Sequence, residues 1–189
     1  MNAHERKCDD GKMTTVFFDI DTQIDFMFPS GALYVPGAER IVPIVAELNR
    51  KAPLVISTMC AHAEDDPEFA VYGHHCVVGT VGQQKPAATL RGDPERQILL
   101  AKQQLNVFSV PELLPLLSRL NAERYVVYGV VTEICVEFAA MGLLDTGKRV
   151  EIVTDAVRSL NDSKAAKMFE RFTAAGGHLI DSTTCIGNG

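Results

Sequence analysis

The sequence lacks the features of a membrane, secreted or nucleic-acid-binding protein. Its 189 residues include no tryptophan and no apolar run near the roughly 20 residues that span a bilayer. The 24 acidic side chains outnumber the 18 basic ones, and no basic cluster offers a surface for nucleic acid or anionic membrane. Residues 1–13 lack the apolar core of a signal peptide. We therefore expect a cytoplasmic protein with a small-molecule partner.

Cysteine is present in an odd number and without CxxC spacing. In a reducing compartment this pattern argues against a disulfide framework and against a thiolate zinc knuckle. Each thiol must therefore be judged by its neighbours in the sequence. The cysteines are Cys8, Cys60, Cys76, Cys135 and Cys185.

The chain has neither internal repeats nor low-complexity tracts, and its length suits one domain. We expect a flexible tail at residues 1–13, which carry little apolar surface, and a single domain at 14–189. Apolar segments predict strands at 14–20, 53–58, 97–102, 124–130, 149–157 and 178–184. Helical spacing predicts helices at 36–51, 110–121, 132–148 and 161–177.

This alternation predicts an α/β fold, in which helices cover both faces of a mostly parallel, doubly wound sheet in three layers. The irregular segment between residues 58 and 97 is long enough to indicate a functional insert. In such folds the active groups gather at the carboxyl ends of the strands.

Three reactive side chains fall at those strand ends, namely Asp21, Lys102 and Cys135. Cys135 opens a predicted helix, where the helix dipole and a nearby lysine would favour the thiolate. Asp21 could act as its general base, and such a set suits acyl transfer from an amide or ester. The residues alone leave a second interpretation open, with a buried inert cysteine, a surface lysine and a capping aspartate.

The opening stretch VFFDIDTQIDF is compatible with two enzyme families. Asp19, Asp21 and Thr22 fit the DxDx[TV] motif of haloacid dehalogenase-like phosphatases. The glycine usual after the second aspartate is missing, however, and no late strand ends in an acidic pair that would hold magnesium. This resemblance is therefore the weaker one.

The chain also resembles the isochorismatase-like cysteine hydrolases, which include nicotinamidases, from about residue 14 to 184. DTQIDF at 21–26 matches the opening D-x-Q-x-D-F motif, and Lys102 in ILLAKQQLNVFS matches the family's lysine. GVVTEICV at 129–136 matches the cysteine signature, and HCVVGTVGQ at 75–83 matches a nicotinamidase segment. The matches occur in the family's order, each of the first three at a predicted strand end.

The resemblance implies a three-layer isochorismatase-like hydrolase fold and a thioester mechanism. Cys135 would be the nucleophile, Asp21 its base, and Lys102 the cation that holds both. The backbone N–H groups of Val131 and Cys135 would form the oxyanion hole, with a cis peptide bond between Val130 and Val131. No organic cofactor is implied.

The resemblance also implies one divalent metal ion, zinc first, with iron or manganese as alternatives. Cys60 stands where the family has an aspartate. Its thiolate could bind zinc and keep four donors in a softer site; alternatively, Asp65 or Asp66 compensates, or the metal is absent. The implied ligands are Cys60, His62, Glu68 and His75. Aromatic residues that would line the substrate ring are Phe26, Tyr72 and Phe108.

The leading prediction is a cysteine-dependent amidohydrolase that converts nicotinamide to nicotinate and ammonia. One alternative is a hydrolase of another small amide or carbamoyl compound that works without a catalytic metal. Another is a catalytically silent binding or oligomer subunit. The resemblance suggests a homo-oligomer, either a dimer or a tetramer.

Overall fold

A six-stranded parallel sheet forms the centre of the protein, whose computed structural model describes residues 14–187. The strand order is β3-β2-β1-β4-β5-β6, and each neighbouring pair is parallel. The predicted tail at 1–13 lies outside the described residues. The strands are β1 Thr15–Ile20, β2 Val55–Cys60, β3 Gln97–Lys102, β4 Arg124–Val130, β5 Arg149–Arg158 and β6 His178–Ile180.

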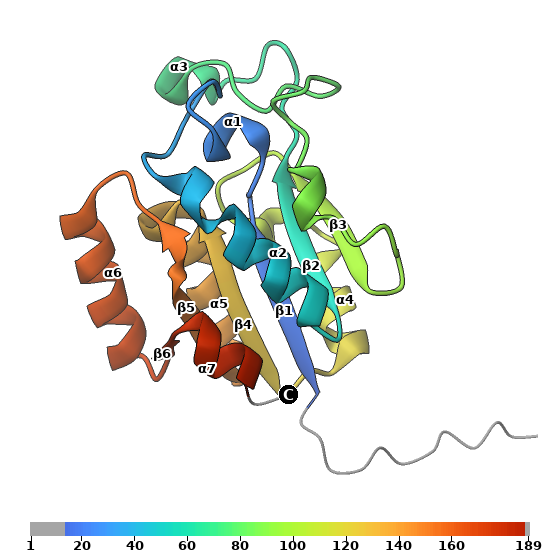
Figure 1. Cartoon of the computed structure of the whole chain (residues 1–189), viewed down its shortest axis with the longest axis vertical. Helices are drawn as coiled ribbons and strands as arrows, with labels where there is room; N and C mark the ends of the chain where they lie inside the picture. Colours follow the sequence, from blue (N-terminus) through green and yellow to red (C-terminus); the bar gives the residue numbers. More distant parts are fainter. Residues whose placement is uncertain (1–13, 188–189) are drawn as a thin grey trace, which may run out of the picture.

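Helices cover both faces of this sheet, which confirms the predicted three-layer fold (Figure 1). α2 and α7 lie on one face, α4 and α5 lie on the other, and the short helices α1 and α3 lie beyond the carboxyl ends of the strands (Figure 1). Within residues 14–187, no helix has the length and apolar character needed to cross a bilayer. The helices are α1 Ile24–Met27, α2 Val42–Lys51, α3 Phe69–Tyr72, α4 Leu113–Leu120, α5 Glu137–Leu144, α6 Asp162–Ala174 and α7 Ser182–Gly187.

The central strands are buried because both of their faces are covered. β1 and β4 are buried along almost their whole length, as apolar runs in parallel sheets require. Phe18 meets Tyr125 edge-on at 5.8 Å between ring centroids, and Phe17 meets Tyr128 at 6.3 Å. The strand order reverses its direction of growth between β1 and β4, which is where ligands bind in doubly wound folds.

Several predicted elements differ from those observed, including the helix predicted at 36–51, which begins as a 3₁₀ turn at Ala38–Ile41. The helix expected from residue 132 begins with a π-helical turn at Thr132–Val136, and regular α-helix starts only at Glu137. The strand predicted at 178–184 is wrong beyond Ile180, because Ser182 begins α7. Asp155 on β5 accepts hydrogen bonds from the Ser182 backbone N–H at 2.8 Å and from its hydroxyl at 2.5 Å, which stabilises this helix start.

A buried ion pair attaches the insert to the middle of the sheet. Lys85 Nζ lies 3.2 Å from Asp19 Oδ2, and neither side chain is more than 1% exposed. Asp19 also accepts hydrogen bonds from Thr22, Asn49 and Ser57. These bonds satisfy a carboxylate that would otherwise be costly to bury.

Replacing Lys85 with methionine is expected to destabilise the fold by about 3–5 kcal/mol, because it leaves Asp19 charged and without its cation. The measurement is urea unfolding followed by circular dichroism. Arg50→Met, which removes the exposed partner of Glu47, is the control and should leave the midpoint unchanged. Equal midpoints for Lys85→Met and the wild type would show that the buried pair contributes nothing.

Candidate active site

Three side chains from different strands meet at the carboxyl edge of the sheet. Asp21 follows β1, Lys102 ends β3, and Cys135 lies in the π-helical turn after β4. Lys102 Nζ is 2.8 Å from Asp21 Oδ2 and 3.8 Å from Cys135 Sγ. All three residues are buried. The structure therefore brings together the carboxylate, ammonium and thiol that the sequence singled out.

The backbone at Asp21 adopts a left-handed conformation, with φ of +48°. Only a few per cent of residues other than glycine do so, and functional sites concentrate them. Gly129 on β4 allows the neighbouring chain to approach closely, because a Cβ atom there would lie 2.1 Å from the carbonyl oxygen of Ile20. The end of β1 is thus held tightly against β4 just before the carboxylate.

Asp21 and Lys102 form an ion pair at neutral pH. Burial alone would raise the pKa of Asp21, but the Lys102 ammonium and hydrogen bonds from Lys102, Thr58 and Cys135 outweigh it, so that the pKa lies below its ordinary value. Burial opposes the charge of Lys102, yet the Asp21 carboxylate holds the pKa of this lysine well above its usual range. The carboxylate is therefore available as a base.

The Cys135 thiol is protonated at rest, contrary to the expected thiolate. Burial raises its pKa well above the ordinary value, the Asp21 charge adds to this, and the Lys102 ammonium only partly opposes it. The expectation is corrected because the thiol sits one turn ahead of the regular α-helix and beside a carboxylate. The Lys102 ammonium contacts both the Asp21 carboxylate and the Cys135 sulfur, which places a proton acceptor close to the thiol.

Val131 and Cys135, whose N–H groups are predicted to form the oxyanion hole, lie before and within the π-helical turn Thr132–Val136. The peptide bond between Val130 and Val131 is cis. The Val131 carbonyl accepts hydrogen bonds from the backbone N–H groups of Ile134 at 3.0 Å and Val136 at 3.1 Å, which fixes the loop around Cys135. The role of the Val131 and Cys135 N–H groups as oxyanion donors stays a prediction.

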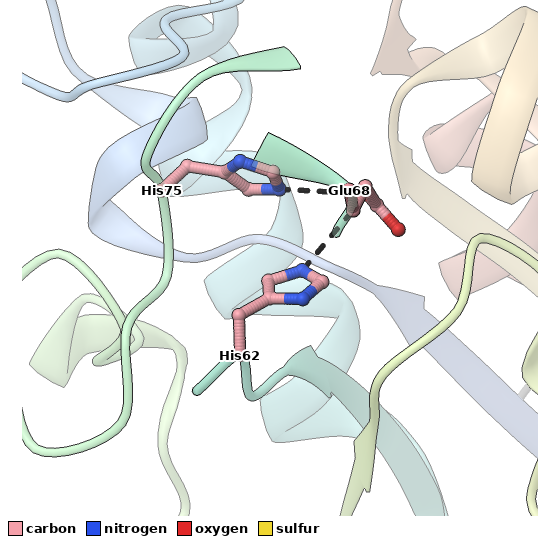
Figure 2. Close-up of side chains that lie close together, drawn as sticks. All are labelled: His62, Glu68 and His75. Atoms are coloured by element: carbon pink, nitrogen blue, oxygen red, sulfur yellow. Dashed lines mark ion pairs between the residues drawn. The ribbon is translucent and has the colours of Figure 1, made fainter. Parts of the chain in front are cut away.

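Three of the four predicted metal ligands converge in the insert (Figure 2). Glu68 Oε1 lies 3.9 Å from His62 Nε2 and 3.7 Å from His75 Nε2. His62 uses its other ring nitrogen on Asp66 at 2.9 Å, and His75 uses its own on the carbonyl of Gly73 at 2.8 Å. Such bonds orient histidines that bind metals.

This cluster fits a divalent cation. His62 Nε2 is buried and has no hydrogen-bond partner among the described residues. Burial lowers the pKa of His75 and so favours its neutral, metal-binding form. Two imidazoles and one carboxylate suit zinc and also suit iron or manganese.

Cys60 does not join the metal cluster, which corrects its predicted role. It pairs in register with Lys102 across β2 and β3, so that its Sγ lies 3.2 Å from Lys102 Nζ. The same sulfur is 3.8 Å from Asp21 Oδ2. Neither expected substitute joins the three ligands, since Asp66 binds the far nitrogen of His62 and Asp65 is exposed.

One cavity connects the Cys135 thiol to the cluster formed by His62, Glu68 and His75. It is lined by Cys135, Glu68 and His75, and by the predicted substrate contacts Phe26 and Tyr72. A group bound between thiol and cluster would therefore touch both aromatic rings.

Phe108 is absent from this cavity and instead lines an adjoining groove, which shares Tyr72 with the cavity; this corrects the third predicted substrate contact. Its 3₁₀ turn at Val107–Ser109 directs the ring against α5, where a Cβ atom on Gly142 would come within 2.3 Å of it.

Two supporting residues lie in the D-x-Q-x-D motif, although the sequence pattern predicted a role only for its first aspartate. The buried Gln23 amide donates to the carbonyls of Cys60 and Gln83 and accepts from the Cys60 N–H, so it joins β2 to the insert. Asp25 accepts from the backbone N–H of Cys76 at 2.7 Å, directly after His75. The alternation of polar residues in this motif was the sequence signal from which supporting roles for Gln23 and Asp25 could have been inferred.

The chain belongs to the isochorismatase family, since the isochorismatase domain model matches residues 15–184. A search of curated proteins finds the probable hydrolase YcaC of Escherichia coli (strain K12), 25% identical over 87 residues. That match covers 46% of this chain and 42% of YcaC, less than half of either protein. Family and relative together support assignment of the chain as a hydrolase.

Solved structures share the whole fold. A pyrazinamidase of Pyrococcus horikoshii in complex with zinc is 27% identical, with a TM-score of 0.81 over 89% of this chain and 99% of that one. The protein PnC1 of L. infantum in complex with nicotinate is 26% identical, with a TM-score of 0.79 over 90% of this chain and 94% of that one.

Alkylation of Cys135 by iodoacetamide should accelerate steadily as the pH rises through neutrality, with no plateau near pH 7, because its pKa is raised. The rate is followed by mass spectrometry of the peptide that contains Cys135. The matched reference is the same reagent on a small free thiol. A plateau below about pH 7 would instead indicate a thiolate at rest.

Metal content should depend on His62 and His75 and be independent of Cys60. After incubation with zinc and gel filtration, His62→Ala and His75→Ala should lose bound metal, whereas Cys60→Ser should keep the wild-type stoichiometry by elemental analysis. Loss of metal in Cys60→Ser would restore the thiol to the ligand set.

Proposed function

We propose that the protein is a cysteine-dependent amidohydrolase that cleaves the C–N bond of a small amide, with nicotinamide as the leading substrate. The observation that carries the proposal is the single cavity in which a thiol, its ion-paired base and a metal-binding cluster meet. Acyl transfer requires the thiol and its base. A metal ion held by the cluster could orient a substrate ring through a lone pair of that ring.

The first step is attack of the Cys135 sulfur on the amide carbonyl carbon. Asp21 accepts the thiol proton, because Lys102 holds its carboxylate close to the sulfur. The N–H groups of Val131 and Cys135 donate to the carbonyl oxygen as it gains negative charge. Asp21 then protonates the leaving nitrogen, ammonia departs, and a thioester remains on Cys135.

The second step returns the enzyme to its starting state. Water attacks the thioester carbon while Asp21 accepts one of its protons, and the carboxylic acid leaves as the Cys135 sulfur regains a proton. Lys102 keeps its proton throughout, because either the Asp21 carboxylate or the Cys135 thiolate lies beside it, and both negative charges raise its pKa. Its positive charge stabilises both the aspartate and the transient thiolate.

The remaining cavity residues position the substrate. His62, Glu68 and His75 would hold a divalent cation, which when bound offers a ligand position to a substrate lone pair such as a pyridine nitrogen. Phe26 and Tyr72 line the space between this cluster and Cys135, where they can pack on an aromatic ring. The zinc and nicotinate complexes of the two structural relatives support this arrangement.

Purified protein supplied with zinc should release ammonia from nicotinamide, measured by a coupled glutamate dehydrogenase assay. Cys135→Ala should lower kcat by roughly 10⁴-fold or more, and Asp21→Asn by about 10²- to 10⁴-fold, because each removes a group that makes or breaks bonds. Cys135→Ala should keep the wild-type unfolding midpoint within a small shift. Asp21→Asn leaves the buried Lys102 ammonium without its carboxylate, so its midpoint should fall and its activity is compared well below that midpoint.

A panel of amides separates this proposal from its alternatives. Preference for simple carbamoyl compounds, with activity unchanged after chelation, would favour an amidohydrolase that needs no metal. Activity of the Cys135→Ala variant equal to that of the wild type would contradict the thioester mechanism itself.

A further inference from the structure

Two side chains of β2 contact the carboxylate of Asp21. Residues 58 and 60 lie on one face of the strand and residue 57 on the other, because side chains alternate along a strand. Ser57 accordingly bonds to Asp19 at 3.0 Å, whereas Thr58 bonds to Asp21. The left-handed backbone of Asp21 therefore turns its side chain to the face opposite that of Asp19.

Thr58 holds both the backbone and the side chain of Asp21. Its hydroxyl donates to Asp21 Oδ1 at 2.6 Å and accepts from the Asp21 N–H at 3.1 Å. Thr58 is fully buried, so water does not compete for either bond. A left-handed residue other than glycine costs roughly 1–3 kcal/mol and persists only where its surroundings fix it. Thr58 supplies two such constraints.

Cys60 contacts the other oxygen of the same carboxylate. Its sulfur lies 3.8 Å from Asp21 Oδ2 and 3.2 Å from Lys102 Nζ. A neutral thiol can donate to the carboxylate and accept from the ammonium at the same time.

We propose that Thr58 and Cys60 are positioning residues that fix the orientation of the Asp21 carboxylate for proton transfer from Cys135. Thr58 fixes Oδ1, and Cys60 together with Lys102 fixes Oδ2. The inference rests on the proposed hydrolysis. It assigns to Cys60 a role at the base, in place of the metal site that its sequence position suggested.

The principal test compares Thr58→Val, which keeps the shape of the side chain but loses the hydroxyl, with Thr58→Ser, which keeps the hydroxyl. Thr58→Val should lower kcat by about 10- to 100-fold with little change in KM, because a misplaced base slows the chemical step more than binding. The acidic limb of the pH profile of kcat/KM should move to higher pH in Thr58→Val. The Thr58 hydrogen bond lowers the pKa of Asp21, so its loss raises that pKa. Thr58→Ser should recover most of both.

Cys60 is tested by the same measurements on Cys60→Ala and Cys60→Ser. The alanine variant should lose about tenfold in kcat, and the serine variant should lose less because its hydroxyl can make both contacts. Bound metal should be unchanged in both variants, which separates the base-positioning role from a ligand role.

Ser57→Ala is the matched control, because it removes a buried hydroxyl from the neighbouring position that bonds to Asp19 instead. It should lower stability without moving the acidic limb, as expected of a purely structural bond. If Thr58→Val does not fold, Thr58→Ala removes the same hydroxyl without adding a methyl group near Asp21.

Wild-type kcat and an unmoved acidic limb in folded Thr58→Val or Thr58→Ala would overturn the inference for Thr58, and unchanged kcat in Cys60→Ala would do so for Cys60. Activity that survives Cys135→Ala would instead remove the proposed function. The two failures are therefore distinguishable.

Discussion

The buried ion pair between Asp21 and Lys102 is the interaction on which the site depends. Two opposite charges removed from water are tolerable only when they lie close together and their remaining bonding capacity is used. The 2.8 Å contact meets the first requirement, and the bonds to Thr58 and to the carbonyl of Gln104 meet the second. The pair costs free energy to bury, and it yields a carboxylate that stays ionised next to a protonated thiol.

The insert between β2 and β3 provides the second half of the site and is attached to the sheet at several points. Lys85 pairs with Asp19 on β1. Gln23 joins the end of β2 to Gln83, and Asp25 binds the backbone directly after His75. These contacts fix a segment that has little regular secondary structure. The cluster of His62, Glu68 and His75 and the Cys135 thiol thereby share one cavity, although they come from distant parts of the chain.

The fold was predictable because its strands are long apolar runs separated by amphipathic helices. The meeting of Asp21, Lys102 and Cys135 followed from their places at the carboxyl ends of parallel strands. The direction of the Cys60 side chain did not follow, since its proximity to Lys102 depends on the register of β2 with β3. The raised pKa of Cys135 did not follow from the sequence either. The sequence identified Lys102, which lowers this pKa, but not the extent of burial, which together with the Asp21 charge raises it more. The start of α7 at Ser182 combines a local cap from Asp181, which accepts from the Thr184 N–H, with a bond to Asp155, which is distant in sequence.

The most direct test of the central claim is acid quenching during turnover of nicotinamide, followed by mass spectrometry of the proteolytic peptides. If thiol, carboxylate and ammonium act as one unit, the nicotinoyl group will be found as a thioester on the peptide that contains Cys135, and the adduct will be absent from Asp21→Asn quenched at the same time. Turnover without any acyl adduct, or an adduct on Cys60 instead, would contradict this account.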